Sequence, residues 1–176
     1  MASRRDFLTA FRKPLEDSSK KEELFVRPPY GKGESFFQNG CIECESKACA
    51  TSCEEKIIVI RSDGTPILNF SKKGCTFCED CAISCDGGVL SLENIQTSEV
   101  INARFIIEPE SCVAHNGVIC FSCKEPCIDD AILFNGMFNP VIDMDLCTGC
   151  GYCFGRCPTM AIKYTPTTIR NEGIEG

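Results

Sequence analysis

The sequence has a single histidine, no tryptophan and no long apolar run. One histidine leaves no set of imidazole ligands and argues against a histidine general base. Because no run reaches about 18 apolar residues, we predict no transmembrane helix. Neither a nucleophile paired with a base, nor a GxGxxG fingerprint, nor a phosphate-binding P-loop is present. We therefore expect a non-catalytic protein rather than an enzyme.

Cysteine, in contrast, is abundant: 16 of 176 residues. Such enrichment is typical of a disulfide scaffold or a metal protein. The chain is 43% hydrophobic and 24% charged, which indicates a globular protein of one domain or two small modules.

The cysteines fall into four groups of four, and none lies outside a group. The second and fourth groups have the spacing Cys-x2-Cys-x2-Cys-x3-Cys, and the other two lengthen one gap. The groups are Cys41, Cys44, Cys49 and Cys53; Cys75, Cys78, Cys81 and Cys85; Cys112, Cys120, Cys123 and Cys127; and Cys147, Cys150, Cys153 and Cys157.

This spacing suits cubane 4Fe-4S clusters, which need four thiolates around a compact core. The first three cysteines of a run wrap one cluster, and the fourth, which we expect to start a helix, reaches the neighbouring cluster. Exchange between runs predicts four ligand sets: Cys41, Cys44, Cys49 and Cys85; Cys75, Cys78, Cys81 and Cys53; Cys112, Cys120, Cys123 and Cys157; and Cys147, Cys150, Cys153 and Cys127.

Zinc and disulfides are the alternatives. Structural zinc usually uses two Cys-x2-4-Cys knuckles separated by a longer spacer, whereas these runs crowd three or four thiols together. Disulfides need an oxidising compartment, and cysteines three apart rarely meet the geometry of a bridge. A zinc-stabilised interaction module is retained as an alternative hypothesis.

The repeat extends beyond cysteine. Four and five residues after each fourth cysteine lies an apolar pair, which a helical turn would bring over the cluster. The pairs are Ile57-Ile58, Val89-Leu90, Ala131-Ile132 and Ala161-Ile162. Short β-like stretches precede three groups, at 67–70, 105–107 and 141–144, and Phe36-Phe37 is a weaker example before the first group.

These features predict two tandem modules. We expect a basic tail with a short helix at 1–33, a first module at 34–92, a polar linker at 93–102, a second module at 103–165 and a C-terminal tail at 166–176. A core of about 60 residues is marginal alone, so bound clusters would supply folding free energy.

The run from Asp145 to Pro158, DLCTGCGYCFGRCP, resembles the motif of bacterial-type ferredoxins. The resemblance covers about residues 40–165 and implies an α+β fold with short strands and helices around the clusters. The proline after the last cysteine is replaced in the other groups, by Glu54, Asp86 and Ile128.

The chain opens with Ser3-Arg4-Arg5-Asp6-Phe7-Leu8, like the start of a twin-arginine export signal. Charged residues rather than an apolar stretch follow, so we expect a cytoplasmic protein that keeps this tail. The tail could form a docking helix for an acidic partner, touch a membrane surface without stable insertion, or be a solvated terminus.

A Ser-Arg-Arg start joined to four ferredoxin runs is similar to the NapF family of ferredoxin-type proteins. The resemblance implies four 4Fe-4S clusters and a role in maturation of, or electron transfer to, the molybdenum-containing catalytic subunit of periplasmic nitrate reductase. An electron-wiring polyferredoxin subunit of another oxidoreductase complex is the alternative.

Charge is unevenly distributed along the chain. Residues 1–40 carry net +2 and the remainder −9, within a total of −7. Each oxidised cluster with four thiolates would add about −2. An anionic body disfavours nucleic acid and favours a basic protein partner.

His115 lies in the long gap between Cys112 and Cys120, beside Asn116-Gly117. The Asn-Gly pair predicts a surface turn, and the alternative is a histidine ligand to iron.

Overall fold

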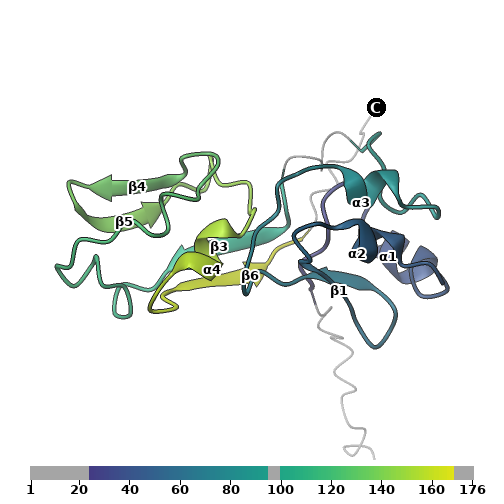
Figure 1. The fold of residues 1–176 in the computed structure, drawn as a ribbon, viewed down its shortest axis with the longest axis horizontal. Helices are drawn as coiled ribbons and strands as arrows, with labels where there is room; N and C mark the ends of the chain where they lie inside the picture. Colours follow the sequence, from purple (N-terminus) through teal and green to yellow (C-terminus); the bar gives the residue numbers. More distant parts are fainter. Residues whose placement is uncertain (1–23, 95–99, 169–176) are drawn as a thin grey trace, which may run out of the picture.

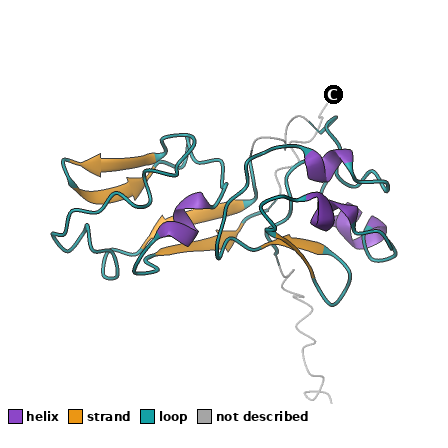
Figure 2. Ribbon diagram, in the orientation of Figure 1, coloured by secondary structure: helices purple, strands orange, loops and turns teal. Residues whose placement is uncertain are grey.

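The computed structural model describes residues 24–94 and 100–168. Short elements joined by longer loops make up the chain, as Figure 2 shows. The first half contains α1 (Glu34–Gly40), α2 (Ala48–Ser52), β1 (Ile58–Ile60), β2 (Pro66–Leu68) and α3 (Asp80–Ile83). The second half contains β3 (Ala103–Ile107), β4 (Ile132–Asn135), β5 (Phe138–Ile142), α4 (Tyr152–Arg156) and β6 (Ile162–Pro166). The mixture of small helices and strands is the expected α+β ferredoxin-like class. The expected short helix of the basic tail falls on residues outside the described ranges.

Three antiparallel strand pairs organise the chain. In the second half β3 pairs with β6, with Phe105 opposite Tyr164, and joins the two ends of that half. Between them lies the β4–β5 hairpin. The first half has the β1–β2 hairpin, and a single bridge between Gly31 and Leu90 joins its ends. Both halves thus have an outer pair that encloses a hairpin.

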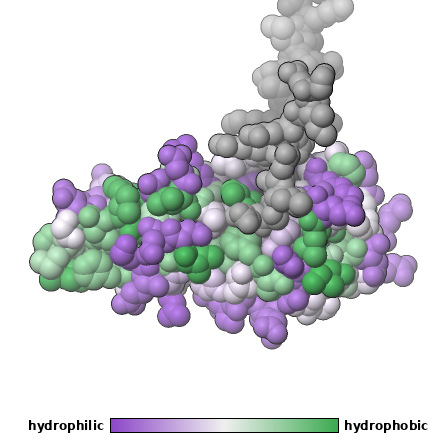
Figure 3. Space-filling view, turned by 90° about the horizontal axis from the view of Figure 1, so that it is seen from above, coloured by the Kyte–Doolittle hydropathy of each residue, from purple (hydrophilic) through white to green (hydrophobic). Residues whose placement is uncertain are grey.

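The elements lie in a row along the longest axis (Figure 1). Helices α1 to α3 occupy one end, the β4–β5 hairpin the other, and β3, β6 and α4 lie between them. Near the hairpin end apolar side chains gather on the face shown in Figure 3, and Leu133, Met137 and Val141 are among the exposed apolar residues. No helix of the described ranges is long and apolar enough to cross a membrane.

The two halves share one hydrophobic core. Phe70, from the first half, is fully buried and meets Phe105 and Tyr164 of the second at ring-centroid distances of 5.5 and 5.4 Å. Tyr164 in turn packs on Phe154 of α4 at 5.1 Å. Aromatic contacts at these separations add to the area that the rings bury. Phe70 therefore anchors one half to the other.

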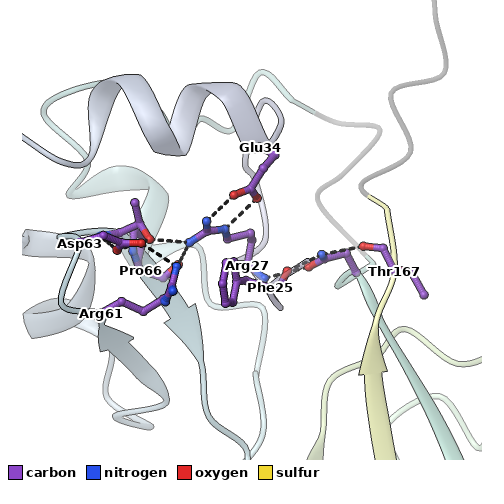
Figure 4. A network of polar contacts seen from close by, with 9 residues as sticks. Phe25, Arg27, Glu34, Arg61, Asp63, Pro66 and Thr167 are labelled. Carbon is purple, nitrogen blue, oxygen red and sulfur yellow. Dashed lines mark hydrogen bonds and ion pairs between the residues drawn. The ribbon is translucent and has the colours of Figure 1, made fainter. Parts of the chain in front are cut away.

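The segment just before α1 is packed, although its composition predicted a tail extending to residue 33. Val26, Arg27 and Tyr30 are 6%, 2% and 3% exposed. The Arg27 guanidinium donates to Glu34, to Thr65 Oγ1 at 2.9 Å and to the Pro66 carbonyl at 2.7 Å (Figure 4). Each guanidinium nitrogen of this buried arginine has an acceptor, and two of the acceptors come from a distant segment, which local composition does not reveal.

Part of the expected linker is also packed. Ile101 is 2% exposed, and the Asn102 amide donates to the carbonyls of Phe25 and Thr167 at 2.8 and 2.9 Å. Asn102 Oδ1 accepts the Arg27 amide at 2.8 Å. Asn102 therefore holds the start of the described chain against its end.

Two local expectations are wrong. Phe36-Phe37 lies in helix α1 rather than in a strand. The fourth cysteine does not start a helix: Cys53 and Cys157 cap the C-terminal ends of α2 and α4. The apolar pairs are buried as expected, but β1, β4 and β6 begin at the second member of the pair, at Ile58, Ile132 and Ile162.

The backbone conformation explains why no helix begins at the fourth cysteines. The third residue after each fourth cysteine has a left-handed conformation, with φ values of 54°, 61°, 51° and 53° at Lys56, Gly88, Asp130 and Met160. A left-handed residue terminates a helix and redirects the chain. Since only one of the four is glycine, the residue types offer little signal for the feature.

Candidate iron–sulfur cluster sites

The structure brings the sixteen cysteines together in four sets, and each set lines its own hollow. The sets are Cys41, Cys44, Cys49 and Cys85; Cys53, Cys75, Cys78 and Cys81; Cys112, Cys120, Cys123 and Cys157; and Cys127, Cys147, Cys150 and Cys153. We call these quartets 1, 2, 3 and 4. Each quartet takes three thiols from one run and one from another.

Short helices place the thiols. Cys49, Cys81 and Cys153 lie in α2, α3 and α4, and the helix of each ends at or next to the cysteine four residues later. The residue before each of these helices is left-handed: Lys47, Glu79 and Gly151 have φ of 43°, 69° and 83°. The third run has no such helix, and turns around Phe121 to Cys127 hold its thiols instead. One helical turn therefore carries thiols that face two different hollows.

Each quartet contains a buried or half-buried cysteine whose pKa is raised by burial and by the charges of the other three members. Burial, then the charges of Cys85, Cys41 and Cys44, raises the pKa of Cys49 to about 11. Burial is again the main cause for Cys81, whose pKa rises to about 12, and for Cys123, whose pKa rises to about 11. The pKa of Cys153 rises above the usual range for the same reason. Ionising four thiols this close together requires a compensating positive charge, which iron would supply when bound.

Backbone amides are directed at the sulfur atoms. The Phe77 N–H donates to Cys75 Sγ at 3.4 Å, the Leu90 N–H to Cys85 Sγ at 3.4 Å and the Ala161 N–H to Cys157 Sγ at 3.2 Å. Donors to sulfur stabilise thiolate charge and are one of the means by which a protein sets a cluster's reduction potential. The donors to Cys85 and Cys157 come from the segments that follow the fourth cysteines.

The donor set fits a polynuclear cluster better than a single ion. Within residues 24–94 and 100–168, no three Cys, His, Asp or Glu side chains converge closely enough to hold one metal ion. Each quartet instead surrounds a hollow, and all of its donors are thiols. Soft thiolate donors in fours are the usual ligands of iron–sulfur clusters.

His115 lies apart from these hollows. Its Nε2 is 3.0 Å from the carbonyl oxygen of Pro140, and it does not line the hollow of quartet 3. Gly117, two residues on, has the positive φ of 81° expected of an Asn-Gly turn. The imidazole thus connects the long loop of the third run to β5, in keeping with the predicted surface turn.

A family model for the 4Fe-4S binding domain matches residues 140–163, which include the whole fourth run. Ferredoxin-type protein NapF of Escherichia coli (strain K12) is 33% identical over 165 residues, covering 92% of this chain and 93% of that protein. Methylamine utilization ferredoxin-type protein MauM of Methylophilus methylotrophus is 30% identical over 191 residues, 96% of this chain and 83% of that protein. Ferredoxin-type protein NapG of Escherichia coli (strain K12) is 27% identical over 178 residues, 88% of this chain and 76% of that protein. Since the identity to NapF extends over nearly the whole of both proteins, the chain is an iron–sulfur electron-transfer protein that belongs to the NapF family of ferredoxin-type proteins.

Proposed function

We propose that the chain binds four 4Fe-4S clusters, one in each quartet. The observation that carries the proposal is that each of the four hollows is lined by four cysteines, with none shared and none left over. When bound, such clusters exchange single electrons. The chain's own part is to hold the thiolates, to direct amides at sulfur and to exclude water with the apolar pairs that follow each run.

We further propose that the four quartets belong to two tandem ferredoxin-like modules. The repeated outer pair and inner hairpin support the division, with quartets 1 and 2 in one half and quartets 3 and 4 in the other. The packed segment from Val26 joins the first module, and Ile101 and Asn102 join the second. The linker is then shorter than composition predicts.

We propose that the protein acts in the cytoplasm. As in the NapF resemblance, the protein assists maturation of, or transfers electrons to, the molybdenum-containing catalytic subunit of periplasmic nitrate reductase. The similarity to NapF along nearly the whole chain supports this role. The acidic body, which four bound clusters would make more negative, favours a partner with a basic patch and a salt-sensitive rate of association.

Anaerobic purification with metal analysis tests the cluster assignment. About sixteen iron and about sixteen sulfide per chain are expected from four cubanes. About four zinc ions without sulfide would support the zinc module instead. Capture of the catalytic subunit's precursor from cytosol by the tagged holoprotein tests the role, and loss of that capture in high salt is the expected signature of a charged interface.

A wiring subunit of another oxidoreductase is the second candidate. The observation that favours it is the 30% identity to MauM over 96% of this chain, a protein whose name refers to methylamine utilization rather than to nitrate. A permanent stoichiometric complex with a flavin- or molybdenum-bearing subunit would support this candidate over the accessory role.

A further inference from the structure

The two halves meet through the ligand loops themselves. The backbone N–H of Cys75, in quartet 2, donates a hydrogen bond of 2.7 Å to the carbonyl oxygen of Cys150, in quartet 4. Both residues lie directly on the walls of their hollows. One hydrogen bond therefore joins two residues that each carry a thiol donor.

Glycine makes this approach sterically possible. A Cβ on Gly74 would lie 2.6 Å from the Tyr152 nitrogen and 2.7 Å from the Cys150 oxygen. A Cβ on Gly151 would lie 2.2 Å from the ring of Phe70, and one on Gly155 3.0 Å from the Lys72 carbonyl. Contacts below 3.0 Å force displacement of backbone or ring, so a larger residue at Gly74 or Gly151 would separate the two loops.

Within each half the quartets are joined differently, through a shared helical turn. Cys49 lines the hollow of quartet 1 and Cys53, four residues on, that of quartet 2. Cys153 and Cys157 relate quartets 4 and 3 in the same way. Ser52 and Ser84 add a hydrogen bond of 2.8 Å between the two runs of the first half. In each half, thiols four residues apart therefore line two different hollows.

We propose that the Cys75–Cys150 contact is the electron crossing between the two halves, and that the quartets form a line in the order 1–2–4–3. Gly74 and Gly151 are positioning residues that keep the two ligand loops in contact. The inference rests on the proposed four-cluster function and deepens it. Quartets 1 and 3 then form the two ends of the line, where exchange with external redox partners takes place.

Transfer across this junction moves one electron. The electron that oxidises the donor on one side as it leaves is the electron that reduces the acceptor on the other, and no proton moves and no bond is made or broken. The Cys75–Cys150 hydrogen bond provides a direct backbone connection between the two ligand loops.

Electron paramagnetic resonance of the reduced holoprotein tests the order. In every sample the exposed ligand Cys78 is changed to serine, whose oxygen shifts the signal of quartet 2 and so labels it. A second substitution then removes a ligand of quartet 4, Cys147→Ala, or, as the matched control, of quartet 3, Cys120→Ala. Both cysteines are partly exposed, and each loss should cost about four iron.

Magnetic broadening falls with the cube of distance, so a cluster's direct neighbours dominate its signal. We expect Cys147→Ala to remove broadening from the labelled signal and Cys120→Ala to leave it nearly unchanged. A larger effect of Cys120→Ala overturns the order. If Cys147→Ala loses more iron than one cluster contains, a second pair of variants tests the order of the quartets.

The second pair of variants is Gly74→Ala and Gly87→Ala, each of which adds a single methyl group near a ligand loop. A Cβ on Gly87 meets nothing within 4 Å, in contrast to Gly74. We expect Gly74→Ala to keep all of its iron and lose part of the broadening, whereas Gly87→Ala matches the unsubstituted chain. Unchanged broadening in Gly74→Ala overturns the proposal. Iron far below sixteen in the unsubstituted protein contradicts the four-cluster function, while full loading with the wrong order contradicts only this inference.

Discussion

The guanidinium of Arg27 and the carboxylate of Glu34 form a two-pronged ion pair, with Arg27 Nε 2.9 Å from Glu34 Oε2. Arg27 is 2% exposed and Glu34 34%. The same guanidinium lies 5.0 Å from the ring centroid of Phe37, so one side chain connects the first described segment to α1 and to the loop before β2.

Replacing Arg27 with methionine should destabilise the protein. The change leaves the Pro66 carbonyl and the Glu34 carboxylate without their donor. Because Glu34 keeps access to water, we expect a loss of about 2–3 kcal/mol, below the ~3–5 kcal/mol for breaking a fully buried pair. Denaturant unfolding of the holoprotein, followed by circular dichroism, measures this change. The control is Lys163→Met, which breaks the exposed pair with Glu108 and should cost no more than about 1 kcal/mol; equal losses would contradict the argument.

Phe70→Ala should loosen the two halves. Phe70 is fully buried between Phe105 and Tyr164, and truncating such a ring costs about 3–5 kcal/mol. The matched control is Phe36→Ala, since Phe36 is 49% exposed and its loss should cost about 1 kcal/mol or less. Limited proteolysis would show whether cleavage between the halves becomes faster. Resistance equal to that of the parent chain would argue against an anchoring role.

Removal of iron should unfold most of the chain. Each half is small, and the buried cysteines of the quartets pack into its core, so cluster binding contributes directly to folding. Treatment with an oxidant and a chelator should abolish the far-ultraviolet circular dichroism of the helices and strands, and anaerobic reconstitution should restore it. A metal-free chain that keeps its native spectrum would show that the apolar core is sufficient.

Loading of the quartets should improve as pH rises. Burial raises the pKa of Cys81 to about 12 and those of Cys49 and Cys75 to about 11, so these thiols hold their protons at neutral pH without metal. Iron binds the thiolate, and loading therefore releases protons and is favoured as proton concentration falls. We expect the extent of anaerobic reconstitution to increase from about pH 6.5 to about pH 8.5. An extent that is independent of pH would contradict this linkage.

Deleting residues 1–14 should weaken binding to the partner. This segment carries Arg4, Arg5, Arg12 and Lys13 beside Phe7, Leu8 and Phe11, and it lies outside the described residues. Anaerobic titration against the partner proposed above, a nitrate reductase catalytic subunit, would measure the loss, with iron content unchanged. The control keeps residues 1–14 and replaces Lys20 and Lys21 with alanine, which lowers the charge without removing the apolar positions. Equal affinity of the deleted and parent chains would discard a docking tail.

The residues from Val26 to Gly31 show why some of the fold escapes sequence reasoning. Charged residues lie at 20–23 and at Lys32 and Glu34, and the segment lacks a cysteine run, so composition assigns it to a tail. In the structure Arg27 meets Thr65 and Pro66, Tyr30 donates to the Phe77 carbonyl at 3.0 Å, and Gly31 bridges to Leu90. Every one of these partners is more than thirty residues away, and local patterns contain no information about such pairs.

The helices between the third and fourth cysteines differ from expectation for a backbone reason. The cysteine spacing predicts that the thiols lie close together, but where each short helix begins and ends depends on which residues adopt the left-handed conformation. Those residues are Lys47, Glu79 and Gly151 before the three helices, and Lys56, Gly88, Asp130 and Met160 after the fourth cysteines. Most of them are not glycine, so the residue types give little sign of the conformation.

The number of thiols, their division into four groups, the burial of the apolar pairs and the mixed α and β character could all be predicted from the sequence. These properties follow from residue types and their spacing along the chain, and the exchange of fourth cysteines between runs stays a prediction from that spacing. Which quartets of different halves lie next to each other depends on the tertiary structure. The contact of Cys75 with Cys150 depends on Gly74 and Gly151 having no side chain and on Phe70 filling the space beside α4, and packing of this kind is a property of surfaces that meet only after the chain has folded.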